Sequence, residues 1–392
     1  MKPLLPTTAR HIIALFFIVF GVFNYGVAAN RYAVATGNWN ATSTWSSSSG
    51  GSSGASVPVA GDDVYIEHGY TVTVTADAAC SSVTIGTNIS GANSTLTFNS
   101  GQTLTVSGNI TVGYNSSYKG TINMNSGGTL KIGGVLTLTA SSYTFSTNSG
   151  NSGTVEYTAT AGGQSIRPIS YYNLTLSNTS GTNTATGNIS VNGTLITTSG
   201  GTFAMSTYQL TGNLNTITNN GIIRTSCTSD PAIPNDKTTW GGTVQYANTS
   251  GKVSRGTYNN LTMLNASGSP QATGNITVNG TLTTTSGGTL DLAGYTLGGT
   301  LGTITNNGTI KSTNSNPFAT GKNWGGTGTV EYSKTDGNQT IASGTYNNLT
   351  CSNTNNTNTI NGNIVVNGTL TTTSGGTLSL SSSSYNLSGT LS

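Results

Sequence analysis

The sequence predicts an all-β protein, a parallel β-helix (β-solenoid) of coils of about 22 residues, closed by an N-terminal cap. Nearly one segment recurs three times, as "GNISVNGTL" at Gly187, "GNITVNGTL" at Gly274 and "GNIVVNGTL" at Gly362, 87 and then 88 residues apart. Apolar residues alternate within it, which is typical of strands. Charged residues make up only 6% of the chain and Gly accounts for 54 residues, unlike an ordinary globular domain.

Residues 1–29 have the pattern of a secretory signal peptide. Lys2 and Arg10 precede the apolar run "IIALFFIVFGVF", and small residues follow at Val27–Ala29. The alternative is an uncleaved membrane anchor, but the run is shorter than the roughly 20 residues that a span requires. We therefore expect a mature chain from about Asn30 that is secreted or displayed at the cell surface.

Residues 30–150 do not follow the later repeats but contain similar short segments. We therefore expect a cap followed by degenerate coils. "SGNITVG" at Ser107 and "NSGGTLKIGG" at Asn125 resemble the repeated segment. Two Trp residues and a group of acids precede them. Bulky and charged residues of this kind are suited to covering the open first coil of a solenoid.

Three copies follow, at residues 153–241, 242–327 and 328–392. Within them a fixed apolar set should face the core and a variable position, Ser190, Thr277 or Val365, should face solvent. Turn-plus-strand units divide each copy into about four coils. The third copy lacks the segments that complete the other two, so we expect the natural protein to continue.

Tandem β-sandwich repeats are the structural alternative, because about 90 residues also suffice for one such domain. The sequence has neither the Cys…Trp…Cys spacing of such domains nor a linker between copies, so nothing in it supports this alternative. A sandwich also leaves the shorter internal period unexplained.

Charge and cysteine content narrow the functional classes. The formal charge is +3, and it falls to about +1 without Lys2 and Arg10. This is too little positive charge to predict binding of nucleic acid or anionic lipid. Cys351 replaces Leu176 and Met263 of the other copies, so it should be a core residue. A disulfide between Cys80 and Cys227 stays open in an oxidising compartment.

Acidic residues are the candidates for catalysis or metal binding. The repeats hold Glu156, Asp230, Asp236, Asp291, Glu331 and Asp336. None forms the repeated pair that a polysaccharide-cleaving groove requires, so we expect no enzyme and no cofactor. Asp62, Asp63, Glu67 and His68 form the densest polar cluster, which suits turn capping better than a metal site.

Surface residues are the remaining candidates for binding. Tyr157, Tyr246 and Tyr332 recur at matching positions and could stack on sugar rings or cover coil ends. Thr277 lies in threonine rows that could form an ice-binding array, although Thr is also simply favoured on strands.

The chain resembles the large, repetitive, secreted surface proteins of Bacteroidota, many of them adhesin-like. "GNWN…STW…VPVAGDDVYIEHGYTVTV" and "GTVEY…YYNLTLS…GNISVNGTL" carry the resemblance, and the first stretch is also similar to the opening of G8-type extracellular β-domains. The resemblance implies a secreted, adhesin-like surface protein. Together with the repeats, it leads us to expect a cell-surface stalk or adhesin whose repeated coils give multivalent weak binding, with cell-surface or extracellular polysaccharide as partner and self-association open. A carbohydrate-binding or ice-binding solenoid, or the spacer of a polysaccharide-active enzyme, is the alternative.

Overall fold

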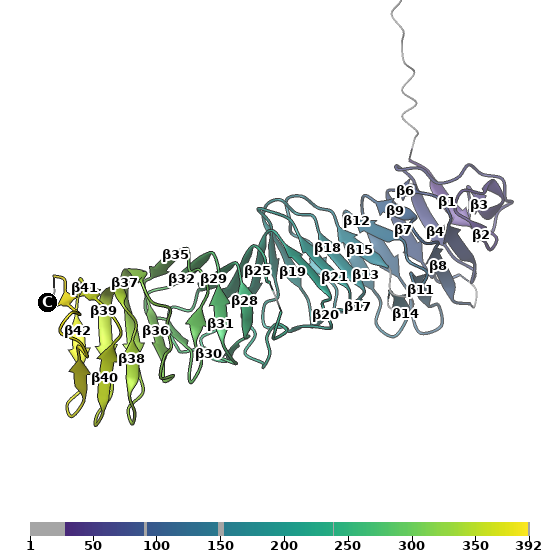
Figure 1. The fold of residues 1–392 in the computed structure, drawn as a ribbon. Coiled ribbons are helices and arrows are strands. Elements are labelled where there is room, and N and C mark those ends of the chain that lie inside the picture. The colour runs from purple at the N-terminus through teal and green to yellow at the C-terminus, as the bar shows by residue number, and fades with distance from the viewer. Residues whose placement is uncertain (1–27, 90–91, 148–152, 238, 391–392) are drawn as a thin grey trace, which may run out of the picture.

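The computed structural model describes residues 28–89, 92–147, 153–237 and 239–390. Almost all of the predicted signal segment, residues 1–29, lies outside them. The described chain forms an elongated stack of about 15 turns with a spacing of about 21 residues, a parallel β-solenoid (Figure 1). The predicted fold class is confirmed, and no helix in the described ranges is long and apolar enough to cross a membrane.

Three sheets form the N-terminal part, and their strands follow one another in hydrogen-bonded order. The six-stranded sheet contains β13 (Leu136–Leu138), β10 (Ile110–Val112), β7 (Ser82–Ile85), β4 (Asp63–Ile66), β1 (Asn30–Ala33) and β3 (Trp45–Ser46). The five-stranded sheet contains β14 (Tyr143–Ser146), β11 (Gly120–Asn123), β8 (Ser94–Phe98), β5 (Thr71–Val74) and β2 (Gly37–Asn38). The seven-stranded sheet contains β24 (Thr216–Asn219), β21 (Thr194–Thr197), β18 (Asn173–Leu176), β15 (Thr154–Tyr157), β12 (Thr129–Ile132), β9 (Thr103–Val106) and β6 (Ala78–Cys80).

Two long sheets run through the repeats. The eight-stranded sheet contains β16 (Ser165–Ile166), β19 (Thr182–Ala185), β22 (Thr202–Ala204), β25 (Ile222–Thr225), β26 (Thr243–Tyr246), β29 (Asn260–Met263), β32 (Thr281–Thr284) and β35 (Thr303–Asn306). The nine-stranded sheet contains β27 (Lys252–Val253), β30 (Gln271–Ala272), β33 (Thr289–Asp291), β36 (Thr309–Ser312), β37 (Lys322–Tyr332), β39 (Gly344–Cys351), β41 (Ile364–Val366) and β44 (Leu387–Ser388), with β42 (Leu370–Thr372) also on β39.

Three short sheets complete the coils. They contain β17 (Ser170–Tyr171), β20 (Ile189–Val191) and β23 (Leu210–Thr211); β28 (Gly256–Tyr258), β31 (Ile276–Val278) and β34 (Leu297–Gly298); and β38 (Gln339–Ile341), β40 (Thr357–Ile360) and β43 (Thr377–Ser379). Most consecutive strands therefore belong to different sheets, and each pairs with a strand from the next coil; β25 and β26, and β36 and β37, are consecutive strands that pair directly. The tandem-sandwich alternative is wrong, because sandwich sheets are antiparallel and these pairings are parallel.

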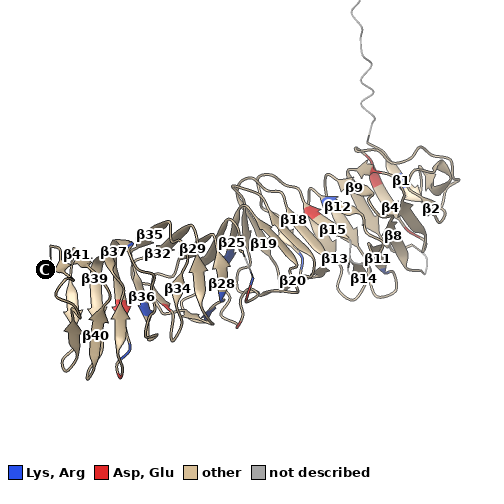
Figure 2. Ribbon diagram, in the orientation of Figure 1, with Lys and Arg blue, Asp and Glu red and all other residues tan. Residues whose placement is uncertain are grey.

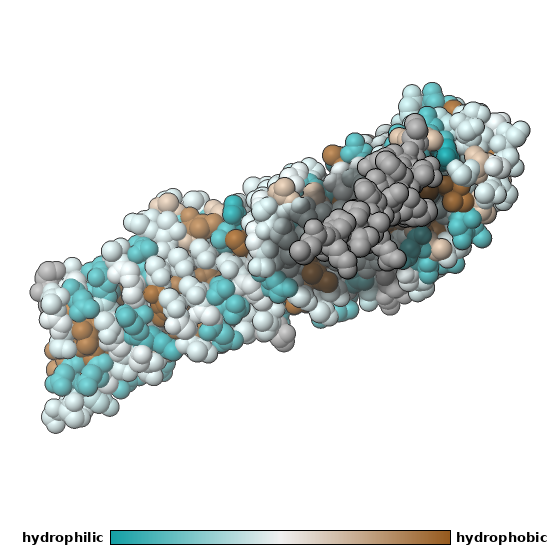
Figure 3. Space-filling view, turned by 90° about the horizontal axis from the view of Figure 1, so that it is seen from above, coloured by the Kyte–Doolittle hydropathy of each residue, from teal (hydrophilic) through white to brown (hydrophobic). Residues whose placement is uncertain are grey.

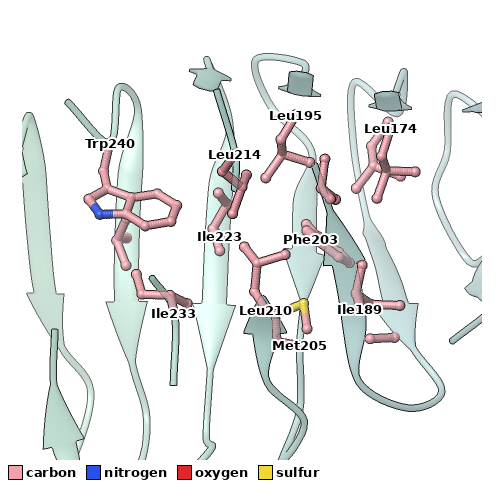
Figure 4. Close-up of a cluster of buried hydrophobic side chains, with 14 of the residues drawn as sticks. Leu174, Ile189, Leu195, Phe203, Met205, Leu210, Leu214, Ile223, Ile233 and Trp240 are labelled. Carbon is pink, nitrogen blue, oxygen red and sulfur yellow. The ribbon is translucent and has the colours of Figure 1, made fainter. Parts of the chain in front are cut away.

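Alternation along each strand separates core from surface, as predicted. In β31, Ile276 and Val278 are buried while Thr277 between them is partly exposed. Figure 4 shows the same inward stacking in the first copy, where Ile189, Leu195 and Phe203 point into the space between the sheets. Each such side chain contributes about 1.5–3 kcal/mol by leaving water, so stacked coils stabilise one continuous core.

The N-terminal end of the core is covered by two tryptophans. β3 lies antiparallel on β1 at the outer edge of the six-stranded sheet, next to the one-turn helix η1 (Thr42–Thr44). Trp39 and Trp45 are buried with ring centroids 5.3 Å apart, and the Trp45 Nε1–H donates to the Trp39 carbonyl at 2.6 Å. This arrangement closes one end of the stack.

The corners between strands hold buried asparagines. In the repeated "ITNNG", the first asparagine is Asn219 or Asn306, and both are buried. Asn306 accepts the Thr284 hydroxyl at 2.6 Å and donates to the Thr329 carbonyl at 3.0 Å, so it links three coils. Satisfied amides of this kind hold the backbone polar groups of a turn that cannot reach water.

Successive copies are rotated by one face of the solenoid. Val155 in β15, near the start of the first copy, lies in the seven-stranded sheet. The equivalent Val244 in β26 instead stacks on Ile223 of β25 in the eight-stranded sheet, and Val330 in β37 stacks on Ile310 in the nine-stranded sheet. Each of the first two copies therefore contains the predicted four or so coils and one further face, and it forms no separate domain.

Candidate functional site

The three repeated tyrosines predicted as a ligand surface lie instead in the core. Tyr157, Tyr246 and Tyr332 are each 0% exposed. They follow an inward valine by two positions in "TVEY" or "TVQY", so the period of the strand places them on the same inward face. The interpretation of these residues as sugar contacts was wrong.

Each buried tyrosine pairs with a second one from the same coil. The Tyr246 and Tyr258 hydroxyls are 3.1 Å apart, the Ser254 N–H donates to Tyr246 at 3.1 Å, and Tyr258 donates to the Ser254 carbonyl. Burial raises the pKa of both tyrosines. The same pairing recurs at 3.0 Å between Tyr157 and Tyr171 and at 3.2 Å between Tyr332 and Tyr346.

The N-terminal acidic cluster is occupied by local contacts. Asp62 is buried, and its carboxylate accepts the N–H groups of Ala29 at 3.0 Å and Val59 at 3.1 Å. Glu67 accepts the Thr87 hydroxyl at 3.3 Å and lies 3.5 Å from His68 Nε2. Within the described ranges, no group of three or more His, Cys, Asp or Glu could hold a metal.

Glu156, Asp291 and Glu331 lie on outward strand positions beside basic or hydroxyl groups, whereas Asp230, Asp236 and Asp336 lie outside the strands. Glu156 is 3.2 Å from Lys131 Nζ and accepts the Ser177 hydroxyl at 2.6 Å. Asp291 is 3.6 Å from Lys311 Nζ, one coil away. Figure 2 shows such charges at scattered positions along the rod.

The three cysteines are free and buried. Cys80 belongs to β6, at one end of the seven-stranded sheet, while Cys227 follows β25, which comes directly after β24 at the other end of that sheet. Strands about 4.8 Å apart place these thiols on the order of 30 Å from each other, far beyond disulfide reach. The Cys80–Cys227 disulfide therefore does not form, whereas the expected core position of Cys351 is confirmed.

Thr277 faces outward, as expected, but its row is short. It lies between Thr257 and Gly298 on the neighbouring coils. Another outward row has Thr262, Thr283 and Thr305, which Gln245 and Arg224 then interrupt. Because each copy rotates by one face, a threonine row changes its residue type where the next copy begins.

Grooves of one kind recur in the first two copies, and a lysine lines each of them. One has a volume of about 480 Å³ beside Leu214, and the other about 410 Å³ beside Leu301. Both leucines have a left-handed backbone, with φ of 43° and 46°. Lys237 Nζ donates to the Asn213 carbonyl and Lys322 Nζ to the Thr300 carbonyl, so each ammonium is held by the chain itself.

A second kind of groove contains an exposed tyrosine. The groove of about 490 Å³ at the junction of the first and second copies, which we call the Tyr295 groove, is lined by Asp230, Asn235, Lys252, Arg255, Gln271 and Tyr295 among others. Tyr295 is 39% exposed. In the third copy a groove of about 540 Å³ beside Tyr385 has the uncharged Ser343, Asn363 and Ser384 in its lining.

The turn that presents this tyrosine is built in the same way in all three copies. The N–H after Tyr208 donates to the Asn188 side chain at 3.0 Å, the N–H after Tyr295 to Asn275 at 3.1 Å, and the N–H after Tyr385 to Asn363 at 2.9 Å. The repeated "YxL" marks these residues but not their exposure, since Tyr295 is exposed whereas Tyr208 and Tyr385 are partly buried against the core. Their place in a turn, away from alternating valines, is the signal that distinguishes them from the buried tyrosines.

Comparison with known proteins gives no further guide to this groove. No family model, curated protein or solved structure matches the chain.

Proposed function

We propose that this chain is an exported structural protein of the cell surface, a stiff β-solenoid that binds extracellular polysaccharide through many weak contacts. The observation that best supports this proposal is the parallel stacking of coils from β1 to β44 (Figure 1). About 15 turns, each adding about 4.8 Å, give a rod on the order of 70 Å long. A rod of this length separates its two ends and exposes a large lateral surface.

The character of that surface supports adhesion. Outward positions are mostly short, uncharged Thr, Ser and Asn, and hydrophobic residues are scattered over the face seen in Figure 3. Hydroxyl and amide groups exchange hydrogen bonds with sugar hydroxyls without the cost of removing ions from water. Repeated copies link such contacts, so avidity greatly exceeds the affinity of one contact.

Export is the part of the proposal that depends on the sequence alone. Lys2, Arg10 and the apolar run that follows them support it. The measurement is the N-terminal sequence of the protein recovered from culture medium or cell surface, which we expect to begin near Asn30. Recovery of uncleaved chain in the cytoplasm would refute this part.

Retention on insoluble polysaccharide tests the binding part. The purified protein is passed over cellulose, mannan and xylan beads, and over beads without sugar. We expect retention on at least one polysaccharide, with elution by excess soluble polymer and weaker competition by its short oligosaccharides, since only the polymer engages several copies. Passage through every column would contradict polysaccharide adhesion.

A further inference from the structure

The Tyr295 groove has the composition of a built recognition site. A half-exposed aromatic ring lies on its wall, and amide, hydroxyl and charged groups from neighbouring coils line the rest. An aromatic face with surrounding hydrogen-bonding groups suits a ligand that has both apolar C–H faces and hydroxyl edges. A pyranose ring has both.

The two basic groups of this groove, Arg255 and Lys252, are already paired. Arg255 makes a two-pronged contact with Asp236, at 2.7 Å from Nε and 2.6 Å from the terminal nitrogen. Lys252 Nζ donates to the Gln271 side-chain oxygen at 2.8 Å. Asp230 adds a carboxylate to the lining. An anionic ligand would have to replace these internal acceptors, whereas a neutral ligand adds hydrogen bonds to groups already held in place.

We infer that the Tyr295 groove binds one or two residues of a neutral saccharide, with the Tyr295 ring against a sugar face and Asn235, Gln271 and Asp230 at its hydroxyl edge. This inference rests on the proposed function and names its ligand class and site. The uncharged groove beside Tyr385 is the counterpart in the next copy, on another face and about 20 Å further along the rod.

Calorimetric titration tests the inference. The purified protein is titrated with neutral hexasaccharides of glucose, mannose and xylose, and with hexagalacturonate as the acidic probe. We expect binding of at least one neutral hexasaccharide and weaker binding of hexagalacturonate. Tyr295→Ala should weaken neutral binding by about tenfold, the loss expected for one aromatic contact.

Two further variants test the location of the site and the class of the ligand. Tyr114→Ala removes an exposed tyrosine outside the groove, 54% exposed, and should leave binding unchanged. Gln271→Ala removes the acceptor of Lys252 and should raise hexagalacturonate affinity relative to the neutral sugar. Circular dichroism and the thermal midpoint of each variant check that the coils stay folded.

The outcomes separate this inference from the proposed function. Unchanged neutral binding in folded Tyr295→Ala overturns the site, and tighter binding of hexagalacturonate by the unmodified protein overturns the ligand class. If no hexasaccharide binds but polysaccharide beads retain the protein, the groove is not the site and adhesion stands. If the beads also fail to retain it, both are refuted.

Discussion

The buried tyrosine pairs should respond strongly to loss of a single hydroxyl group. In the second copy, Tyr246→Phe removes the acceptor of the Ser254 N–H, which is 3.1 Å away. Both the tyrosine and Ser254 are 0% exposed, so water cannot replace the lost partner. A buried donor left unsatisfied costs about 1–3 kcal/mol, and we expect the free energy of unfolding to fall by that amount.

Hydrogen exchange gives the most direct assay, because each coil contacts only its neighbours and the effect should be local. Mass spectrometry should show faster exchange in the peptide that contains Ser254, and urea unfolding should show a lower midpoint. Tyr258→Phe should cost less, since it leaves an unpaired carbonyl rather than an unpaired N–H. The double variant should cost less than the sum of the two, because the bond between the hydroxyls is lost only once.

Tyr295→Phe is the matched control, since it removes a hydroxyl from a partly exposed tyrosine in the same copy. It should change neither the midpoint nor the exchange rate. If Tyr246→Phe behaves like this control, the hydroxyl pair does not stabilise the coil and the reasoning fails.

Four further results are expected. Burial raises the pKa of the six paired tyrosines, so their contribution to stability should be fully present well below pH 10 and be lost as pH rises through about 10 and above, where the unfolded chain loses protons first; a flat urea midpoint from pH 8 to 11 would refute this. Cys80, Cys227 and Cys351 should react with a thiol reagent only after unfolding, because all three are buried and burial raises the pKa of Cys351 to about 11; rapid labelling of the folded protein would contradict it. Leu261→Ala should lower the free energy of unfolding by about 2–5 kcal/mol in urea titrations, as it opens a cavity in the core. Thr277→Tyr should change it by less than about 0.5 kcal/mol, since the side chain points outward, and a larger loss would show that the position is not tolerant.

Period-two alternation was sufficient to predict the stacking. Alternate side chains of a strand point to opposite faces, so the face that carries apolar residues such as Ile276 must be the inward one. The rotation between copies could not be predicted in the same way. It depends on how many residues each corner uses, and this number varies: two residues separate β35 from β36, whereas four separate β32 from β33. Counting turn signals therefore gave four coils and missed the additional face.

Binding residues were harder to predict than the core. The sequence repeats Tyr246 and Tyr295 with equal regularity, yet one is buried and the other lines a groove. Spacing from the nearest inward valine separates them in principle. The groove itself depends on Arg255 and Lys252 reaching across coils, which alternation does not encode.

The rotation of each copy by one face also bears on how such a gene changes length. The first strand of the second copy stacks on the last strand of the first copy, and the third copy stacks on the second in the same way. Loss or gain of a whole copy by recombination therefore keeps every apolar position inward. Everything beyond the junction, however, turns by a third of a revolution. Only a change of three copies restores the original orientation of a distal segment, so length variants of this protein would fold equally well and yet present their far ends in three different directions.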